Sequence, residues 1–430
     1  MSKTIHPEWA QDWFAKVIKQ SKFKVRTIPL KSSKEWVLEN GMINHKSGLF
    51  FKIVGISWSD KNSGKYIRPL IEQREVGTLG FLLRRGKNGT QILAQAKIEP
   101  GNVGFCQIGP TFQATASNAA KVHGGKVPAY KKYFELGAKH EVFQTLQSEQ
   151  GTRFLGKLNR NTLVLAKKPV RPTTLHQWVD TEKLLNAVDH NNFINTDSRS
   201  VLVCSPWEIL IGRRPFSNNK SAFAEELEAS YKNFSQEKLD TVLQNIEAKR
   251  SKTPEPVMKD LRHMEGWKLT PNGIQSNTRK PYSIKQIAVT AYGREVSHWD
   301  QPIVDSTHNG TVDLCCLKID GVLQFYFVPR AEAGLVYKVE LGPSIVSEPG
   351  HYLKKPKGQG KVMASVSQSD EGGRFFQDVS KYRILQLNNQ KGLEPGGFWL
   401  TLGEVCALLK KENVFTNESR SVLSLLLKWL

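Results

Sequence analysis

The chain has 430 residues, which exceeds the length at which one hydrophobic core usually stops growing, so two domains are expected. Hydrophobic residues make up 39% of the chain and charged residues 23%, which excludes an intrinsically disordered protein. The net charge of +21 would attract polyanions, but Lys and Arg are scattered along the whole chain without the spacing of a known nucleic-acid-binding motif. Nucleic acid is therefore not expected as a partner.

The cysteines give no sign of a metal site or a disulfide framework. Cys106, Cys204, Cys315, Cys316 and Cys406 form no CxxC pair and have no His at zinc spacing. No run reaches the roughly 18 apolar residues of a membrane span, and the N-terminal segment lacks the pattern of a signal peptide. We expect a cytoplasmic protein that has no metal and no contact with a membrane.

The chain is expected to open with a helix. Pro7 suits a first helical turn, where its missing N–H group is not needed. Trp9, Trp13 and Val17 follow at a spacing that places them on one face. The pattern is typical of an amphipathic helix.

Two parts of the chain resemble each other, and this similarity sets the expected domain boundaries. Residues 69–110 align without gaps on residues 302–343, and SRSVL at 198–202 recurs at 419–423. The segment between the two parts has apolar residues at helical spacing and predicts one or two linker helices. The expected units are an N-terminal helix at 1–22, a first repeat at 23–215, a helical linker at 216–251 and a second repeat at 252–430.

Each repeat is expected to form a sheet of hairpins and to end in a helix. Short apolar or alternating runs are separated by glycine-containing turns, which is typical of such sheets. Asp180 and Thr401 are equivalent N-cap candidates, and Thr401 with Glu404 fits a capping box. Arg199 and Arg420, within SRSVL, are expected to tie loops together by hydrogen bonds. The fold class is mixed α/β (α+β), with mixed sheets flanked by helices.

Common catalytic motifs are missing from the sequence, which has no Walker loop, GxSxG, HExxH or glycine-rich dinucleotide fingerprint. A dense polar stretch at residues 95–125 remains, and it contains Lys97, Glu99 and His123. In one interpretation the polar groups of this stretch line a pocket for a phosphorylated, hydroxyl-rich ligand. In the other, Lys97 and Glu99 are merely neighbours on one face of a strand. In that second interpretation Gly101 merely serves a turn.

Each of two matched pairs of residues likewise allows a ligand-binding interpretation and a purely structural one. Arg153 and Arg374 each stand beside glycine, where they would clamp a diphosphate or remain ordinary surface residues. Trp36 and Trp267 would stack on a base or belong to the core.

Long motifs carry a resemblance to a known family over nearly the whole chain. They include QREVGTLGFLLRR, LAQAKIEPGNVGFCQIGPTFQATASN, KVHGGKVPAYKKYF, LQSEQGTRF and NTDSRSVL in the first repeat, and WDQPIV, ELGPS, DEGGRF, WLTL and ESRSVL in the second. The sequence resembles the NDP-hexose 2,3-dehydratases of deoxysugar biosynthesis. The resemblance implies two tandem duplicated Nudix-like domains, a homodimer, a nucleotide-sugar substrate such as dTDP-4-keto-6-deoxy-glucose, and chemistry without a cofactor.

The resemblance also implies a set of ligand contacts. Catalysis is expected in the first repeat, together with Thr152 and Arg153. The second pocket, with Gly373 and Arg374, is expected to be vestigial or supporting, because DSTHNG at 305–310 departs from the family pattern. Glu99, Lys97 and His123 are the candidates for acid–base roles, which stay unassigned. The substrate contacts expected by similarity are Trp36, Ser117, Asn118, Ala119, Lys121, Val122, His123, Thr152, Arg153, Trp267, Tyr352, Gly373 and Arg374.

The function expected from the resemblance is removal of water across C2 and C3 of the sugar. A ketone at C4 acidifies the C3 proton, so a base, an acid and donors to the developing enolate suffice. The alternative is a non-catalytic nucleotide-sugar binding protein, which would bind the ligand without removing water. An anion-binding protein would show an affinity that falls steeply with salt.

Overall fold

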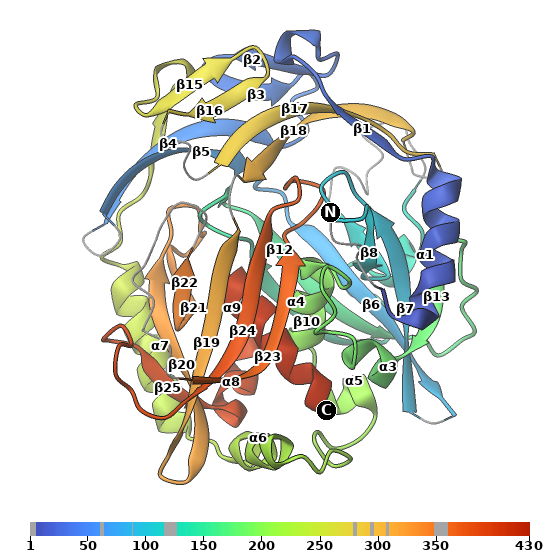
Figure 1. The fold of residues 1–430 in the computed structure, drawn as a ribbon, viewed down its shortest axis with the longest axis vertical. Helices are drawn as coiled ribbons and strands as arrows, with labels where there is room; N and C mark the ends of the chain where they lie inside the picture. Colours follow the sequence, from blue (N-terminus) through green and yellow to red (C-terminus); the bar gives the residue numbers. More distant parts are fainter. Residues whose placement is uncertain are drawn as a thin grey trace.

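The protein was examined as a computed structural model, which describes residues 6–60, 64–87, 89–115, 127–277, 282–292, 296–306, 309–347 and 360–430. We call residues 23–215 the first half and residues 252–430 the second half. Two large sheets face each other across central helices, and two smaller sheets lie together above them in the view of Figure 1. The class is mixed α+β, as expected.

The two large sheets have the same strand order. The first runs β10-β12-β6-β7-β13, with β8 beside β7 and β9 beside β6. The second runs β23-β24-β19-β20-β25, with β21 beside β20 and β22 beside β19. The first sheet consists of β6 (Gly77–Gly86), β7 (Gly89–Ile98), β8 (Cys106–Gly109), β9 (Phe112–Ala114), β10 (Glu141–Ser148), β12 (Leu158–Leu165) and β13 (His176–Asp180). The second consists of β19 (Gly310–Ile319), β20 (Val322–Ala331), β21 (Val339–Pro343), β22 (Ile345–Ser347), β23 (Gly360–Ser369), β24 (Val379–Leu387) and β25 (Phe398–Thr401).

The two small sheets exchange their first strands. β1 of the first half pairs with β17 of the second, and β14 of the second half pairs with β4 of the first. One sheet consists of β2 (Trp36–Glu39), β3 (Met42–His45), β4 (Lys52–Asp60), β5 (Gly64–Glu72), β11 (Phe154–Leu155) and β14 (Val257–Lys259). The other consists of β1 (Lys24–Thr27), β15 (Trp267–Thr270), β16 (Gly273–Ser276), β17 (Tyr282–Thr290) and β18 (His298–Ser306).

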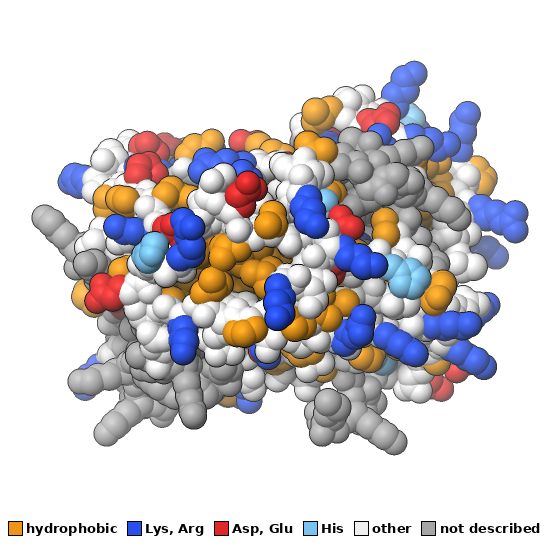
Figure 2. Space-filling view, turned by 90° about the horizontal axis from the view of Figure 1, so that it is seen from above, with side chains coloured by type: hydrophobic (Ala, Val, Ile, Leu, Met, Phe, Trp, Pro, Cys, Tyr) orange, Lys and Arg blue, Asp and Glu red, His pale blue; other side chains and the backbone are white. Residues whose placement is uncertain are grey.

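Lys and Arg side chains are spread over the face that these small sheets form. Figure 2 shows them scattered singly among polar and hydrophobic side chains, with no continuous basic stripe on this face. The distribution on this face matches the even spread of Lys and Arg along the sequence.

Helices α4 (Thr196–Cys204) and α9 (Asn417–Leu423) pack against each other between the large sheets (Figure 1). No helix of the described ranges is both long enough and apolar enough to cross a membrane. The remaining α-helices are α1 (Glu8–Ser21), α3 (Thr181–Leu185), α5 (Trp207–Ile211), α6 (Ala222–Lys232), α7 (Gln236–Arg250) and α8 (Leu402–Leu409). Short 3-10 turns occur at Leu30–Ser32, Lys131–Tyr133, Leu261–His263 and Ser424–Trp429.

Most helix predictions are confirmed. The opening helix is α1, the linker contains α6 and α7, and Thr401 forms a capping box with Glu404. Asp180 occupies the equivalent position before α3 without capping it, because its carboxylate accepts a hydrogen bond from Gln91 Nε2 at 2.7 Å. The expected helix after Asp180 is correspondingly short.

The SRSVL arginines hold the central helices in place, as predicted. Arg199 is fully buried and donates to the carbonyl oxygen of Val188 at 2.6 Å and to Ser424 Oγ at 2.9 Å. Arg420 is equally buried and donates to Ser200 Oγ at 2.9 Å. Each guanidinium therefore links a helix of its own half to residues of the other half.

Two glycines let a loop of each half approach the other half closely. The Gly101 N–H donates to the carbonyl of Gly372 at 2.8 Å, and a Cβ on Gly101 would lie 1.5 Å from the carbonyl oxygen of Phe375. Gly334 makes the reciprocal contact with Gly151 at 2.9 Å. Only a residue without a side chain fits at such a distance. Gly101 thus does more than serve a turn.

Candidate active site

A cavity of about 510 Å³ lies where the first large sheet meets both small sheets and a loop of the second half. Its volume falls in the range of small-molecule ligand sites. The side chains that line it are Glu35, Trp36, His45, Ser47, Phe50, Phe51, Gln73, Leu79, Lys97, Glu99, Pro100, Gln113, Ala114, Thr115, Pro128, Lys157, Asn159, Asp197, Val296, His298, Trp299, Asp300, Gln301, Glu371 and Arg374, with backbone from Gly77 and Gly373. We call it the main cavity.

The structure brings together only part of the residue set expected from the sequence. Trp36, Lys97, Glu99, Gly373 and Arg374 line the main cavity. The other expected contacts lie elsewhere or outside the described residues. Thr152 and Arg153 line a second, smaller cavity, Trp267 lines neither of these two cavities, and the expected contacts Ser117, Asn118, Ala119, Lys121, Val122, His123 and Tyr352 lie outside the described residues.

The expected division of the two arginines between the halves is wrong. Arg374 of the second half lies with the first-half residues Lys97 and Glu99, whereas Arg153 of the first half lines the cavity of the second half. The physical reason is the reciprocal contact at Gly101 and Gly334, which carries each arginine loop across to the other half. The main cavity is therefore built from both halves.

Arg374 is fixed at the cavity wall by packing and hydrogen bonds. Its guanidinium carbon lies 4.2 Å from the centre of the Phe51 ring, a distance typical of a cation–π contact. Nη2 donates to Gln73 Oε1 at 3.4 Å, and Gln301 Nε2 holds the carbonyl of Gly373 at 2.7 Å. A fixed guanidinium with a planar fork of donors suits the recognition of a phosphate group.

Aromatic side chains form another part of the wall. Trp36 is 4% exposed, its ring centre lies 4.6 Å from that of Phe51, and its indole N–H donates to the carbonyl of Asp300 at 2.7 Å. Its ring also meets the imidazole of His45 edge-on at 5.3 Å. Burial is the main cause that lowers the pKa of His45, although Glu35 and Asp300 oppose the change. Trp36 thus belongs to the core and also lines the cavity.

Lys97 and Glu99 fit both of the alternatives drawn from the sequence. Lys97 lies near the end of β7 and Glu99 directly after it, and Lys97 Nζ is 3.9 Å from Glu99 Oε1. Gln113 Nε2 is 3.5 Å from the same carboxylate oxygen. The two side chains share one face, and that face lines the main cavity.

Close to Lys97 and Glu99, buried acids surround a second lysine, Lys157. Burial raises the pKa of Asp197 well above its usual value, and the nearby carboxylates of Glu371, Glu149 and Glu99 raise it further. Burial and Glu371 likewise raise the pKa of Glu149. Burial lowers the pKa of Lys157, although Glu371, Glu149 and Glu75 oppose the change. Asp197 and Lys157 line the main cavity, and shifted groups at a cavity wall are typical of acid–base sites.

Sequence analysis missed Asp197, Lys157 and Glu371. Asp197 directly precedes SRSVL, and an acid, Glu418, stands at the same place before the second SRSVL. This repeated acid was the available signal. Nothing in the sequence indicates that Glu371 reaches a cavity of the first half, because that placement depends on the exchanged loops.

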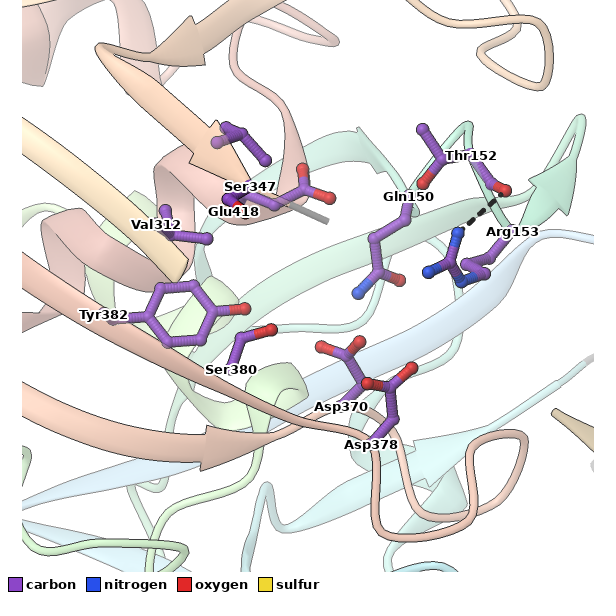
Figure 3. A pocket seen from close by; sticks show the side chains of 11 residues that line it. Gln150, Thr152, Arg153, Val312, Ser347, Asp370, Asp378, Ser380, Tyr382 and Glu418 are labelled. Carbon is purple, nitrogen blue, oxygen red and sulfur yellow. Dashed lines mark hydrogen bonds between the residues drawn. The ribbon is translucent and has the colours of Figure 1, made fainter. Parts of the chain in front are cut away.

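The second cavity measures only about 30 Å³. Figure 3 shows the carboxyl groups of Asp370 and Asp378 side by side on its wall, with the Tyr382 ring facing them across the space. Burial and Asp378 raise the pKa of Asp370 well above its usual value. Its lining residues are Gln150, Thr152, Arg153, Val312, Val346, Ser347, Asp370, Asp378, Ser380, Tyr382 and Glu418.

Known proteins resemble this chain to different degrees. A solved structure described as that of an ADP compounds hydrolase aligns with 34% of this chain and 84% of its own, at 14% identity and a TM-score of 0.23, which is too low to define the fold. The dTDP-4-dehydro-6-deoxy-alpha-D-glucopyranose 2,3-dehydratase of Saccharopolyspora spinosa is 29% identical, over 96% of this chain and 89% of that protein. Enzymes of the same name from Amycolatopsis orientalis and Streptomyces violaceoruber are also 29% identical, over 88% and 95% of their lengths.

A family model described as NDP-hexose 2,3-dehydratase matches residues 8–205 and again residues 239–426. These ranges include Lys97, Glu99 and Asp197 in the first match and Glu371 and Arg374 in the second. The resemblance found in the sequence is confirmed, and the chain belongs to the NDP-hexose 2,3-dehydratase family.

Proposed function

We propose that this enzyme removes water across C2 and C3 of a dTDP-4-keto-6-deoxy-hexose and releases a 3,4-diketo-2,6-dideoxy sugar still linked to the nucleotide. Family membership supports the reaction, and the names of the three relatives support the substrate. The observation that carries the proposal is the main cavity, which joins an aromatic and arginine-lined wall to buried acids and lysines.

The side chains of the main cavity match the parts of such a substrate. Trp36 and Phe50 offer aromatic surface to a base, and Arg374 offers two or more N–H donors to the diphosphate. Lys97, Glu99 and the neighbouring polar side chains are left for the hydroxyl-rich sugar. A nucleotide sugar needs all three kinds of contact in one cavity.

The reaction needs only proton transfers. The C4 ketone acidifies the proton on C3, a base removes that proton, and the C2–O bond breaks as the hydroxyl leaves as water. The enol that forms between C2 and C3 then rearranges to the diketone. Lys97 and Glu99 are the described acid–base candidates from sequence, and the positive charge of Lys97 would stabilise an enolate oxygen placed beside it.

The test is mass spectrometry of the purified protein incubated with dTDP-4-keto-6-deoxy-glucose and a reagent that traps the diketone. We expect a product lighter than the substrate by one water. A thermal shift with dTDP and an unchanged substrate mass would instead support a nucleotide-sugar binding protein.

We further propose that the two halves are tandem copies with the boundaries 23–215 and 252–430, flanked by the helical segments at 1–22 and 216–251. The shared strand order of the large sheets and the two separate matches to one family model support this duplication. A Nudix-like fold, a homodimer and a cytoplasmic location remain proposals from the family resemblance.

A further inference from the structure

Asp197 lies at the main cavity, and one of its carboxyl oxygens has no partner among the described residues. It lies in the first turn of α4, is 2% exposed, and lines the cavity. Its buried Oδ1 accepts no hydrogen bond from any described residue. The helix does not need Asp197 as a cap, because Asn195 Oδ1 accepts from the Ser198 N–H at 2.8 Å. A buried polar atom that no described residue satisfies is suited to a hydrogen bond with a bound ligand.

The surroundings of Asp197 favour the protonated form of its carboxyl group. Three carboxylates act on it, those of Glu371, Glu149 and Glu99, and one cation, that of Lys97, opposes them. Burial adds to the effect of the acids, so the pKa lies well above the usual value. A raised pKa favours the protonated form of the carboxyl group, which is the form that a general acid must have.

We propose that Asp197 is the general acid that protonates the C2 hydroxyl as it leaves. The inference rests on the proposed function and adds a catalytic residue to it. Lys97, whose charge acts on Asp197, would stabilise the carboxylate that forms.

The proton transfers balance over one turnover. The base takes the C3 proton, the electron pair of the C3–H bond forms the C2–C3 double bond, and the C2–O bond breaks. The oxygen takes the Asp197 proton and departs as water. When the enol becomes the diketone, its C3 hydroxyl gives its proton to the Asp197 carboxylate, and C2 takes the proton that the base holds. The base and Asp197 thereby return to their starting states.

The second half offers a matched control for Asp197. Glu418 stands at the corresponding place, directly before SRSVL and in the first turn of α9. It lines the cavity of about 30 Å³, which has no room for a hexose. Glu418→Gln therefore removes a half-buried acid at the same place in a helix without touching the main cavity.

The test compares Asp197→Asn with Glu418→Gln in the full-length protein. We expect Asp197→Asn to slow water loss about 10²- to 10⁴-fold, and Glu418→Gln to stay near the wild-type rate. In deuterated water, Asp197→Asn should still exchange the C3 proton, because the base is intact. Thermal unfolding with and without dTDP checks that both variants fold and bind the nucleotide.

A 2-deoxy-2-fluoro analogue of the substrate sharpens the test. Fluoride leaves without a proton from an acid, so Asp197→Asn should release fluoride at close to the wild-type rate. Loss of both exchange and fluoride release in a folded variant would overturn the inference and make Asp197 the base or a structural residue. Normal water loss in Asp197→Asn would also overturn it. If the wild-type protein neither exchanges the C3 proton nor loses water, the proposed function itself fails.

Discussion

The two cavities occupy corresponding places in the halves and differ more than tenfold in volume, at about 510 and 30 Å³. Each is lined by a large sheet of its own half and by an arginine loop from the other. The main cavity has Lys157 near its acids, whereas the corresponding position in the second half carries Asp378. Tyr382 fills the second cavity where the first half has Asn161. The two halves share a framework, and the side chains that line their cavities differ.

The difference in charge has a chemical consequence. Asp370 and Asp378 stand together in the second cavity, and Ser306 donates a hydrogen bond to Asp378. With Asp378 at the position of Lys157, the second cavity has one lysine fewer to attract a diphosphate. The second cavity is therefore unsuited to the substrate both by its size and by its charge.

The largest expected effect comes from the exchanged arginines. Arg374→Ala should lower kcat/KM by about 10²-fold, which corresponds to about 3 kcal/mol of lost contacts to the diphosphate. Arg153→Ala is the matched control, because Arg153 packs on the Tyr282 ring at 4.4 Å much as Arg374 packs on Phe51 at 4.2 Å. Steady-state rates of water loss would show the difference. A large loss of kcat/KM in Arg153→Ala and none in Arg374→Ala would indicate that catalysis takes place in the cavity that holds Arg153.

Removing the ring that fills the second cavity should affect stability and not catalysis. Tyr382 is 2% exposed, and Tyr382→Asn should lower the free energy of unfolding by about 3 kcal/mol, because a large buried side chain is lost. Urea denaturation measures the loss, and Tyr382→Phe, which keeps the ring, should cost much less. Water loss should continue at the wild-type rate in both variants. A tenfold fall in that rate would indicate that the second cavity takes part in the reaction.

The two tryptophans separate binding from stability. The Trp36 indole donates to the carbonyl of Asp300, and the Trp267 indole donates to the carbonyl of Ile67, each at 2.7 Å. Either change to Phe should therefore cost about 1 kcal/mol of stability. Only Trp36→Phe should also raise KM, by about tenfold, because only Trp36 lines the main cavity. Equal KM values for the two variants would contradict a role of Trp36 in substrate binding.

The last expected effect is a dependence of stability on pH. Burial raises the pKa of Glu340 to about 7 from an ordinary value of 4.5, so the folded protein binds a proton that the unfolded chain releases between these values. Wild-type stability should consequently fall as the pH rises from about 4.5 to about 7. Glu340→Gln introduces the residue that the first half has at Gln107 and removes this fall.

Unfolding measured in urea at pH 5 and pH 8 tests the prediction. The variant should gain about 2.5 kcal/mol on the wild type between these two pH values. The Ser148 hydroxyl, which donates to Glu340 at 2.7 Å, has a carbonyl oxygen as its partner in the variant. A constant difference between the two proteins would show that Glu340 is charged in the folded state.

The sequence allowed the elements to be predicted more fully than the site. Hairpins, the linker helices and the Thr401 cap follow from local patterns, and local interactions determine them in the structure. Arg153 and Arg374 each reach the cavity of the other half, which depends on the path of the chain in space. An alignment of the two halves cannot show this, because it assigns each residue to its own half. Gly101 indicates that another part of the chain packs closely against it, but the sequence does not show which part. No described residue satisfies the buried Oδ1 of Asp197, and this depends on packing that the neighbouring residues in the sequence do not reveal.

The reciprocal glycine contacts have a consequence for how such a protein changes over generations. The second half has a cavity too small for the substrate, yet it supplies Glu371 and Arg374 to the cavity that accepts it. Selection on the reaction therefore acts on both halves, and neither can be deleted or replaced alone. A gene for either half by itself would encode a protein that lacks part of the site.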